Sequence, residues 1–423
     1  MLSVPKRLTD SIAHYAKFPQ TGVSLRQMVE FGQNPNQGTL LKAAQFLHDE
    51  LPIRLAHRVV ELDNLPNNLD KMPSIQRVKR WYIESFNDLV NFPRVPEKML
   101  QYIRIDEEHR NATLQKIPEA KPNHSLSTPE AIRTPNSLPS LSKRYHFKTL
   151  STDFPPEFSE YNKRFVNCIE HIKRRHDSVV STVAQGINEY KKHIGVNLID
   201  DRAQMFLDRF YLSRIGIRML IGQQIALNLP KSPPGFVGVI QTNIKLDEVV
   251  QEAIDNATFV CEDHYMLLTT PKVTLQCPDN IHFTYVPSHL HHMVFELLKN
   301  SLRAVVETYG DEADDYPEIK VVISEGSEDI TIKITDEGGG IPRSEIDKVW
   351  TYMYTTADAP SVEDSLYKSD FKAPLAGFGY GLPLSRLYAR YFGGDLRLVS
   401  MEGRGTDAYL HLSRLSNSEE PLA

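Results

Sequence analysis

The sequence predicts an α+β protein, with an antiparallel helix bundle in the amino-terminal half and an α/β sandwich domain after it. Residues 10–230 contain long stretches of helical periodicity and no strand pattern, which is typical of a bundle. Strand patterns begin beyond residue 238 and alternate with helices, as in a mixed sheet covered by helices on one face. The tract KSPPGFVG at residues 231–238 separates the two parts, so we place the domains at 10–230 and 238–415.

Four periodic segments account for most of the predicted bundle, at residues 39–61, 75–90, 157–190 and 202–228. Residues 111–142 differ from them, because five prolines lie there among Ser, Thr, Asn and Lys. Such a tract buries too little apolar surface to order itself. We therefore expect a disordered insert within the bundle.

Composition excludes several classes of protein. The chain has 423 residues, of which 41% are hydrophobic and 24% charged, as in an ordinary globular protein. No apolar run approaches the ~20 residues that span a bilayer, so we expect no membrane insertion. A net charge of −6 argues against nucleic acid as a partner. The three cysteines have no CxxC spacing, which indicates neither a disulfide framework nor a structural zinc site.

The second domain is predicted from two strand pairs and two helices. Residues 319–324 and 329–336 form one strand pair, and residues 395–400 and 406–412 form another around the turn MEGRG. The helices are expected at 288–307 and at 382–392, where Gly393 and Gly394 end the second one.

The helix at 288–307 has two unlike faces, and Ser288 is expected to cap it. His292, Glu296 and Asn300 stand at i, i+4 and i+8 on its polar face, with Lys299 and Arg303 beside them. Such a stripe alone is typical of a solvated surface helix. The opposite face is apolar and consists of Leu290, Met293, Val294, Leu297, Leu298, Ala304 and Val305.

Three glycine-containing loops follow this helix. DEGGGIP at 336–342 comes after a strand, GFGYGLP at 377–383 opens a helix, and GRGT at 403–406 lies in the last strand pair. Glycines let the backbone approach a ligand, and those before a helix form a nest of N–H groups suited to phosphate. Each loop alone is compatible with a simple turn, but the set in this order is specific.

The polar helix and the three loops resemble, in order, the N, G1, G2 and G3 boxes of the GHKL ATPase superfamily, whose ATP-binding domain has the Bergerat fold. The wording of the motifs narrows this further. YVPSHLHHMVFELLKN, TDEGGGIP, APLAGFGYGLPLSRLYARYFGGDL and MEGRGTDAYL resemble the mitochondrial pyruvate dehydrogenase kinases, as does FLHDELPIRLAHRV in the first domain. The related branched-chain 2-oxoacid dehydrogenase kinase shares the boxes and is the alternative.

The resemblance implies an ATP-dependent serine kinase with roles for individual residues. Glu296 resembles the general base, His292 its orienting partner, and Asn300 the ligand of Mg²⁺. Asp336 resembles the acceptor of the adenine amino group. Nucleotide contacts are implied for Lys299, Asn300, Arg303, Asp336, Gly338, Gly340, Thr355, Thr356, Gly377, Phe378, Gly379, Tyr380, Gly381, Leu382 and Thr406. Residues 357–376 match a lid over ATP.

The resemblance also implies partners and a regulatory site. Tyr82, His176, Arg214 and Arg218 match an allosteric pocket for pyruvate-like acids, and an ion-pair network within the bundle is the alternative for them. The implied partners are the decarboxylase alpha subunit, the lipoyl domain of the acetyltransferase core and a second copy of the chain, in the mitochondrial matrix. The segment SNSEEPLA after the last strand lacks the Asp-Trp signature by which some members reach across a dimer. A histidine autokinase using His176 and a non-catalytic nucleotide switch remain further alternatives.

Overall fold

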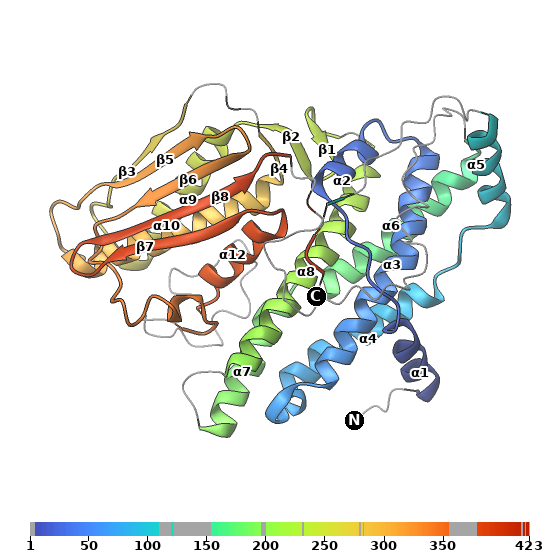
Figure 1. Ribbon diagram of the computed structural model, residues 1–423, viewed down its shortest axis with the longest axis horizontal. Helices are drawn as coiled ribbons and strands as arrows, with labels where there is room; N and C mark the ends of the chain where they lie inside the picture. Colours follow the sequence, from blue (N-terminus) through green and yellow to red (C-terminus); the bar gives the residue numbers. More distant parts are fainter. Residues whose placement is uncertain are drawn as a thin grey trace.

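The computed structural model describes residues 5–109, 120–121, 154–195, 200–230, 232–278, 281, 283–354, 379–415, 418 and 420–422. The predicted insert at 111–142 lies outside these residues, apart from 120 and 121. Within them the two expected parts are present, a helical part and a sheet covered by helices (Figure 1). In the described part of the chain no helix is long and apolar enough to cross a membrane.

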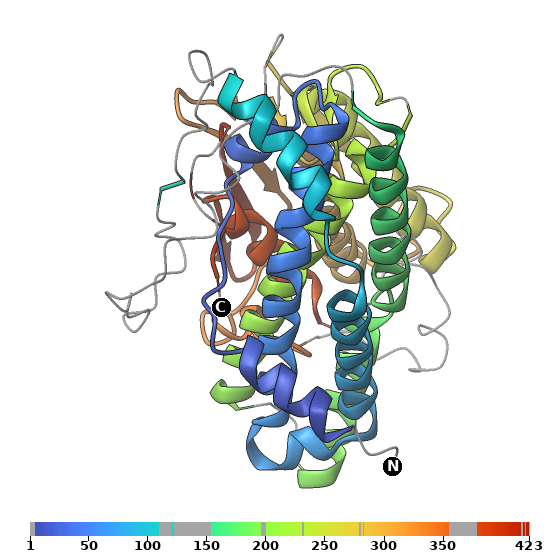
Figure 2. The same ribbon diagram turned by 90° about the vertical axis from the view of Figure 1, so that its right-hand side faces the viewer.

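The first part is a bundle whose long helices run side by side (Figure 2). Its elements are α1 (Lys6–Tyr15), α2 (Leu25–Gly32), α3 (Gln37–Asp63), the short 3-10 helix η1 (Pro66–Lys71), α4 (Pro73–Asn91), α5 (Glu97–His109), α6 (Pro156–Arg175), α7 (Val179–Ile194) and α8 (Asp201–Leu227). The predicted segments 39–61, 75–90 and 202–228 correspond to α3, α4 and α8, so the bundle is confirmed.

One predicted helix, 157–190, is wrong, because the chain breaks it into α6 and α7 at residues 176–178. The His176 ring stacks on Tyr82 of α4 with centroids 4.5 Å apart, and its Nε2 lies 3.0 Å from Ser85 Oγ. These contacts hold the turn between the helices without glycine or proline, the residues that usually mark a break. Local sequence therefore carried no signal for it.

The second part contains a five-stranded sheet with the order β3-β5-β6-β8-β7. Strand β3 pairs parallel to β5 and the other neighbours are antiparallel, so the sheet is mixed, as predicted. Helices α9, α10 and α12 lie on one face of it (Figure 1). The strands are β3 (Val273–Gln276), β5 (Ile319–Glu325), β6 (Asp329–Thr335), β7 (Asp395–Met401) and β8 (Gly405–Ser413), and the helices are α9 (Leu246–Tyr265), α10 (Pro287–Tyr309), α12 (Gly381–Tyr391) and the 3-10 helix η4 (Lys348–Trp350).

A second, three-stranded sheet was not predicted from the sequence. It has the order β1-β2-β4 and consists of β1 (Phe236–Val237), β2 (Ile240–Ile244) and β4 (Phe283–Tyr285). These strands are only two to five residues long. So short a run shows little alternation, which explains why periodicity did not reveal them.

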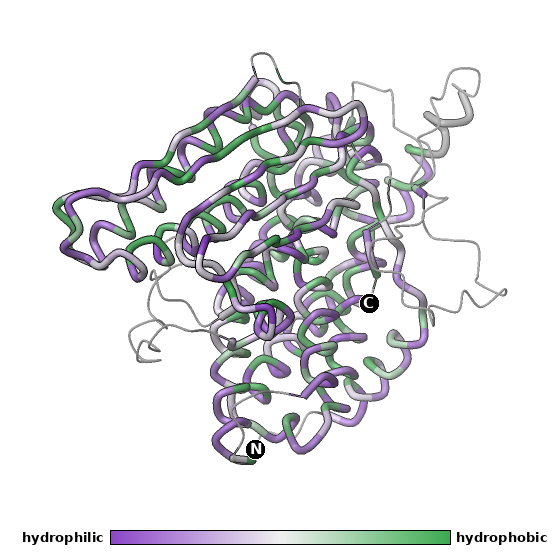
Figure 3. The backbone as a smooth tube through the Cα atoms, turned by 60° about the vertical axis from the view of Figure 1, so that its left-hand side comes forward, coloured by the Kyte–Doolittle hydropathy of each residue, from purple (hydrophilic) through white to green (hydrophobic). Residues whose placement is uncertain are grey.

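Hydrophobic and hydrophilic residues alternate along the strands that contribute to the core (Figure 3). Ile330, Ile332 and Ile334 of β6 are fully buried, and each contributes about 1.5–3 kcal/mol relative to an exposed side chain. Helix α10 buries the predicted apolar face with one exception, since Ala304 is only half-buried and lines the cavity described below. The helix also begins one residue early, at Pro287, so Ser288 is not its cap. A proline suits this first position because it needs no N–H partner there.

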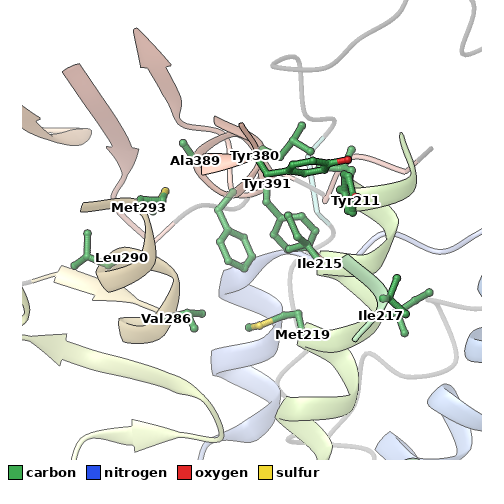
Figure 4. Close-up of a cluster of buried hydrophobic side chains, with 14 of the residues drawn as sticks. Tyr211, Ile215, Ile217, Met219, Val286, Leu290, Met293, Tyr380, Ala389 and Tyr391 are labelled. Atoms are coloured by element: carbon green, nitrogen blue, oxygen red, sulfur yellow. The ribbon is translucent and has the colours of Figure 1, made fainter. Parts of the chain in front are cut away.

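Helices α8 and α12 join the two parts. Tyr211, Ile215 and Met219 of α8 face Tyr380 and Tyr391 in a buried cluster (Figure 4). Tyr211 and Tyr380 meet edge to face with centroids 5.8 Å apart. The bundle therefore packs directly against the helix that follows the second glycine loop.

Candidate active site

A cavity of about 340 Å³ lies beside α10, between the loop after β6 and the glycine loop before α12. Its walls bring together residues that are more than a hundred positions apart in the chain. From the predicted set, the lining contains Glu296, Lys299, Asn300, Arg303, Asp336, Gly338, Gly340, Gly379, Gly381, Leu382 and Thr406.

Glu296 is buried in the wall of this cavity, with 8% of its surface exposed. Lys299 Nζ donates a hydrogen bond of 3.0 Å to its Oε1. Burial raises the pKa of Glu296, but the positive charges of Lys299 and His292 outweigh burial and hold this pKa below its usual range. The carboxyl group is therefore ionised and accepts protons or hydrogen bonds, as a base must.

His292 lies one turn before Glu296 on the same face of α10 and is half-buried. Its ring meets the Tyr388 ring of α12 edge to face, with centroids 5.3 Å apart. His289, for which no role was predicted, lies against the same tyrosine at 4.6 Å. Tyr388 thus packs against the side of α10 that carries the candidate base.

Asp336 follows β6 and is also buried. Its Oδ1 accepts the backbone N–H groups of Gly338 at 3.0 Å and Thr406 at 3.2 Å, and its Oδ2 accepts the Ser301 hydroxyl at 2.8 Å. Burial raises the pKa of Asp336, although these three hydrogen bonds oppose that effect. The carboxyl group joins the first glycine loop, the last strand pair and α10 at one point.

Glycine is required in the first loop for two reasons. Gly339 and Gly340 have φ of 76° and 71°, and a Cβ at Gly340 would lie 2.1 Å from the carbonyl oxygen of Met401. The third loop closes on the first, since Gly403 N donates to Gly339 O at 2.8 Å. GRGT at 403–406 is thus a turn that also completes the site.

Residues 379–383, the described part of the second glycine loop, lie directly over the candidate base. Gly379 has φ of 73°, and its carbonyl accepts from Met353 N at 3.2 Å. A Cβ at Gly381, the first residue of α12, would lie 2.2 Å from Glu296 Oε2. Backbone N–H groups at the start of α12 and the Glu296 carboxylate therefore share one end of the cavity.

The chain matches known families along its length. Residues 22–241 match the family of mitochondrial branched-chain alpha-ketoacid dehydrogenase kinase, and residues 285–416 match the histidine kinase-, DNA gyrase B- and HSP90-like ATPases. The mitochondrial pyruvate dehydrogenase (acetyl-transferring) kinase of Schizosaccharomyces pombe is 44% identical, and the alignment covers 99% of this chain and 99% of the relative. The same kinase of Arabidopsis thaliana is 42% identical, over 99% of this chain and 97% of its own length. Isozyme 3 of Homo sapiens is 37% identical over 98% of this chain and 87% of its own length. This chain belongs to the pyruvate dehydrogenase kinase family.

Membership of that kinase family confirms the predicted resemblance, the α+β fold and an enzyme of the protein kinase type. The ATPase match extends over the cavity, so the site on α10 belongs to an ATP-binding domain. The roles of single residues in it stay predictions, and four of them, Thr355, Thr356, Gly377 and Phe378, lie outside the described residues.

Two predicted nucleotide contacts have side chains engaged with other protein groups. Tyr380 is absent from the cavity lining and packs instead between Tyr211 and Tyr352, at centroid distances of 5.8 and 5.2 Å. Arg303 lines the cavity and also forms an ion pair of 3.2 Å with Glu307.

The four residues assigned to an allosteric pocket do lie together in the bundle. Tyr82 stacks on His176, the Arg214 guanidinium donates to the His176 carbonyl at 3.3 Å, and Arg218 pairs with Asp177 at 2.9 Å. The Tyr82 hydroxyl is buried and makes no hydrogen bond within the described residues. Burial raises the pKa of Tyr82 to about 12, although nearby arginines oppose that effect, so this group is a neutral donor beside cationic side chains.

Sequence reasoning missed three residues that shape the site. The Ser301 hydroxyl donates to Asp336. Ala304 lies so close to Gly338 that a Cβ added to Gly338 would come within 2.6 Å of the Ala304 Cβ. Tyr388 braces His292 from α12. Ser301 was within reach of the helical pattern, being next to Asn300, whereas Tyr388 has no local signal because only tertiary packing brings α12 to α10.

Proposed function

We propose that this kinase transfers the γ-phosphoryl group of ATP to a serine of the decarboxylase alpha subunit of a pyruvate dehydrogenase complex. The order of the polar side chains along α10 supports this proposal most directly. Glu296 and Asn300 lie one turn apart on the face that lines the cavity, beneath the glycine loop. A base and a metal ligand so arranged suit a phosphate held between a nucleotide and a hydroxyl group.

The residues divide the work as follows. The serine hydroxyl oxygen bonds to the γ-phosphorus while the bond to the β,γ-bridging oxygen breaks, and ADP leaves. Glu296 accepts the hydroxyl proton, and His292 orients Glu296. Lys299, which donates to Glu296 and lines the same cavity wall, would also reach the phosphates of bound ATP. Asp336 accepts from the adenine amino group.

A magnesium ion fits this set of donors. Among the described residues there is no cluster of three or more His, Cys, Asp or Glu side chains that would form an all-protein cage. Mg²⁺ bound with nucleotides needs none, because phosphates and water fill most of its six positions. The Asn300 amide oxygen is the protein ligand that we propose, and the ion would neutralise charge on the β- and γ-phosphates.

The relatives are mitochondrial pyruvate dehydrogenase kinases, which supports the pyruvate dehydrogenase complex over the branched-chain alternative. It also supports mitochondria as the location, and within them we propose the matrix. A histidine autokinase is disfavoured because His176 is 3% exposed and stacked inside the bundle. A non-catalytic nucleotide switch would not need an ionised carboxylate and a metal ligand side by side.

For the lipoyl domain we propose an apolar cavity of about 110 Å³ between α2, α3 and α8, which suits the hydrocarbon arm of a lipoyl group. Met28, Phe31, Phe46 and Leu227 contribute to its lining. We also propose a homodimer, which sedimentation of the purified enzyme would test. Binding of the lipoyl domain to a Met28→Trp variant, in which the larger side chain fills the cavity, would test the lipoyl site.

The deciding experiment for the function supplies purified pyruvate and branched-chain decarboxylases side by side with labelled ATP. We expect acid-stable phosphate on serines of the pyruvate decarboxylase alpha subunit, mapped by mass spectrometry. Phosphate found mainly on the branched-chain protein would reverse the order of the two candidates, and acid-labile phosphate on His176 would support the autokinase.

A further inference from the structure

Glu420 comes from the far end of the chain and is buried between the two parts of the molecule, with 2% of its surface exposed. In Figure 1 the carboxyl end of the chain lies beside α8, where bundle and sheet domain meet. A glutamate near a chain end is normally solvated, and a buried charge is costly unless it is paired. The surroundings of Glu420 provide such pairing.

Four donors converge on this carboxylate. The Arg54 guanidinium, on α3, donates to both of its oxygens, at 3.0 Å to Oε2 and 2.5 Å to Oε1. Val23 N donates to Oε1 at 3.2 Å, and the Tyr391 hydroxyl donates to Oε2. Burial and the neighbouring carboxylate raise the pKa of Tyr391 well above its usual value, so the hydroxyl stays a donor.

The rest of the structure is shaped to receive this group. Gly216 of α8 faces it, and a Cβ there would lie 2.7 Å from Glu420 Oε2 and 2.9 Å from Arg54 Nη1. Glu50 accepts from Arg54 Nε at 2.8 Å and from Thr21 N at 2.8 Å, which holds the guanidinium in place. The bidentate geometry is the strong form of an arginine–carboxylate pair.

One of the four donors belongs to the ATP-binding domain. Tyr391 is the last residue of α12, whose first residue is Gly381, about 15 Å away along the helix axis. Gly381 lies so close to Glu296 that it leaves no room for a Cβ, and Tyr388, near the same end as Tyr391, packs against His292. The position of α12 therefore decides where the second glycine loop lies relative to the candidate base.

We propose that Glu420 is a positioning residue for the nucleotide site: it ties the end of α12 to Arg54 of the bundle and so sets residues 379–383 of the second glycine loop over Glu296. The inference rests on the proposed function, in which that loop holds the phosphates. It predicts that loosening the Glu420–Tyr391 contact weakens ATP binding and slows transfer, although neither residue touches the nucleotide.

The test compares Tyr391→Phe and Glu420→Gln with a matched control, Tyr316→Phe. Tyr316 is 9% exposed and belongs to the same domain, and its hydroxyl donates to Gly310 O at 2.8 Å, away from the carboxylate. Calorimetry with Mg·ATP, steady-state kinetics, amide exchange at residues 379–384 and thermal unfolding are measured for each. We expect at least a five-fold higher Kd for ATP and a lower kcat in the two variants, with faster exchange, and neither effect in the control.

The outcomes separate a positioning role from a stabilising one. If Tyr391→Phe lowers the thermal midpoint as much as Tyr316→Phe does, yet keeps wild-type Kd, kcat and exchange, Glu420 only stabilises the fold and the proposal is overturned. Should Glu420→Gln fail to fold because Arg54 loses its counter-charge, Tyr391→Phe still decides, since it changes no charge. A wild-type enzyme that bound no ATP would instead overturn the proposed function.

Discussion

Lys299 Nζ lies 3.0 Å from Glu296 Oε1, and both side chains are buried in the wall of the cavity. The candidate base and a candidate phosphate ligand therefore form an ion pair with each other. The pair keeps a positive charge inside a buried site, where the proposed phosphates would bind. Burial raises the pKa of Glu296, but the charge of Lys299, together with that of His292, outweighs burial and keeps this pKa below its usual value.

Replacing Glu296 with Gln tests this arrangement directly. The shape is kept, basicity is lost and Lys299 is released toward the phosphates. We expect ATP to bind as tightly as in wild type or more tightly, while phosphoryl transfer falls by ~10²–10⁴-fold. Single-turnover assays at saturating ATP measure the second effect. His292→Ala should cost less, because the carboxylate remains, and a Glu296→Gln enzyme with wild-type turnover would remove Glu296 from the mechanism.

Gly381→Ala should impair catalysis without unfolding the protein. The new Cβ would lie 2.2 Å from Glu296 Oε2, and the end of a flexible side chain can move away at little cost. We expect a reduced kcat at a nearly unchanged thermal midpoint. Gly222→Ala is the matched control, since a Cβ on this α8 glycine meets only Val239 at an ordinary 3.6 Å. Equal activity of both variants would contradict the placement of Glu296.

Asn300→Ala should abolish binding of Mg·ATP and with it activity, because the metal loses its proposed protein ligand. Isothermal titration with and without Mg²⁺ measures this. Asn256→Ala serves as the control, since this α9 residue is exposed and bonds to His291 outside the cavity. Unchanged nucleotide affinity in Asn300→Ala would contradict the metal assignment.

Asp336→Asn should weaken adenine nucleotides by ~1.5–3 kcal/mol, the range for a hydrogen bond to a charged group, and should reduce the preference for ATP over GTP. Ser301→Ala removes one internal partner of the carboxylate but keeps the acceptor, so that variant should lose stability and retain the preference. Competition binding with both nucleotides distinguishes the two. An Asp336→Asn enzyme that kept its full preference would place adenine elsewhere.

The lowered pKa values of two histidines, His176 and His289, predict how the free energy of unfolding depends on pH. Burial lowers the pKa of His176 to about 4 and that of His289 to about 3. The unfolded chain therefore binds protons that the folded one does not as pH falls below the unperturbed value of ~6.5, and the free energy of unfolding drops through that window. Each contributes at most ~1.4 kcal/mol per pH unit. His289→Gln should flatten urea-unfolding free energies between pH 6.5 and 4, and an unchanged slope would show that His289 titrates normally.

Much of this protein follows from local pattern. The period of 3.6 located α3, α4, α8 and α10, and the period of two located β6, since Ile330, Ile332 and Ile334 must all face one side of a strand. The same pattern put Glu296 and Asn300 on one face of α10, and the wording of the glycine loops identified the family. These features are decided by residues within a few positions of one another.

Tertiary structure decided the rest, because it depends on side chains that meet only after folding. The break between α6 and α7 is held by His176 against α4, and Tyr380 turns from the cavity toward Tyr211 of the bundle. The Arg54–Glu420 pair joins positions 366 residues apart, and the sequence around either residue does not indicate that the other is its partner. Local sequence sets backbone preference, whereas burial of charge and aromatic packing is settled by whichever distant groups share the same space.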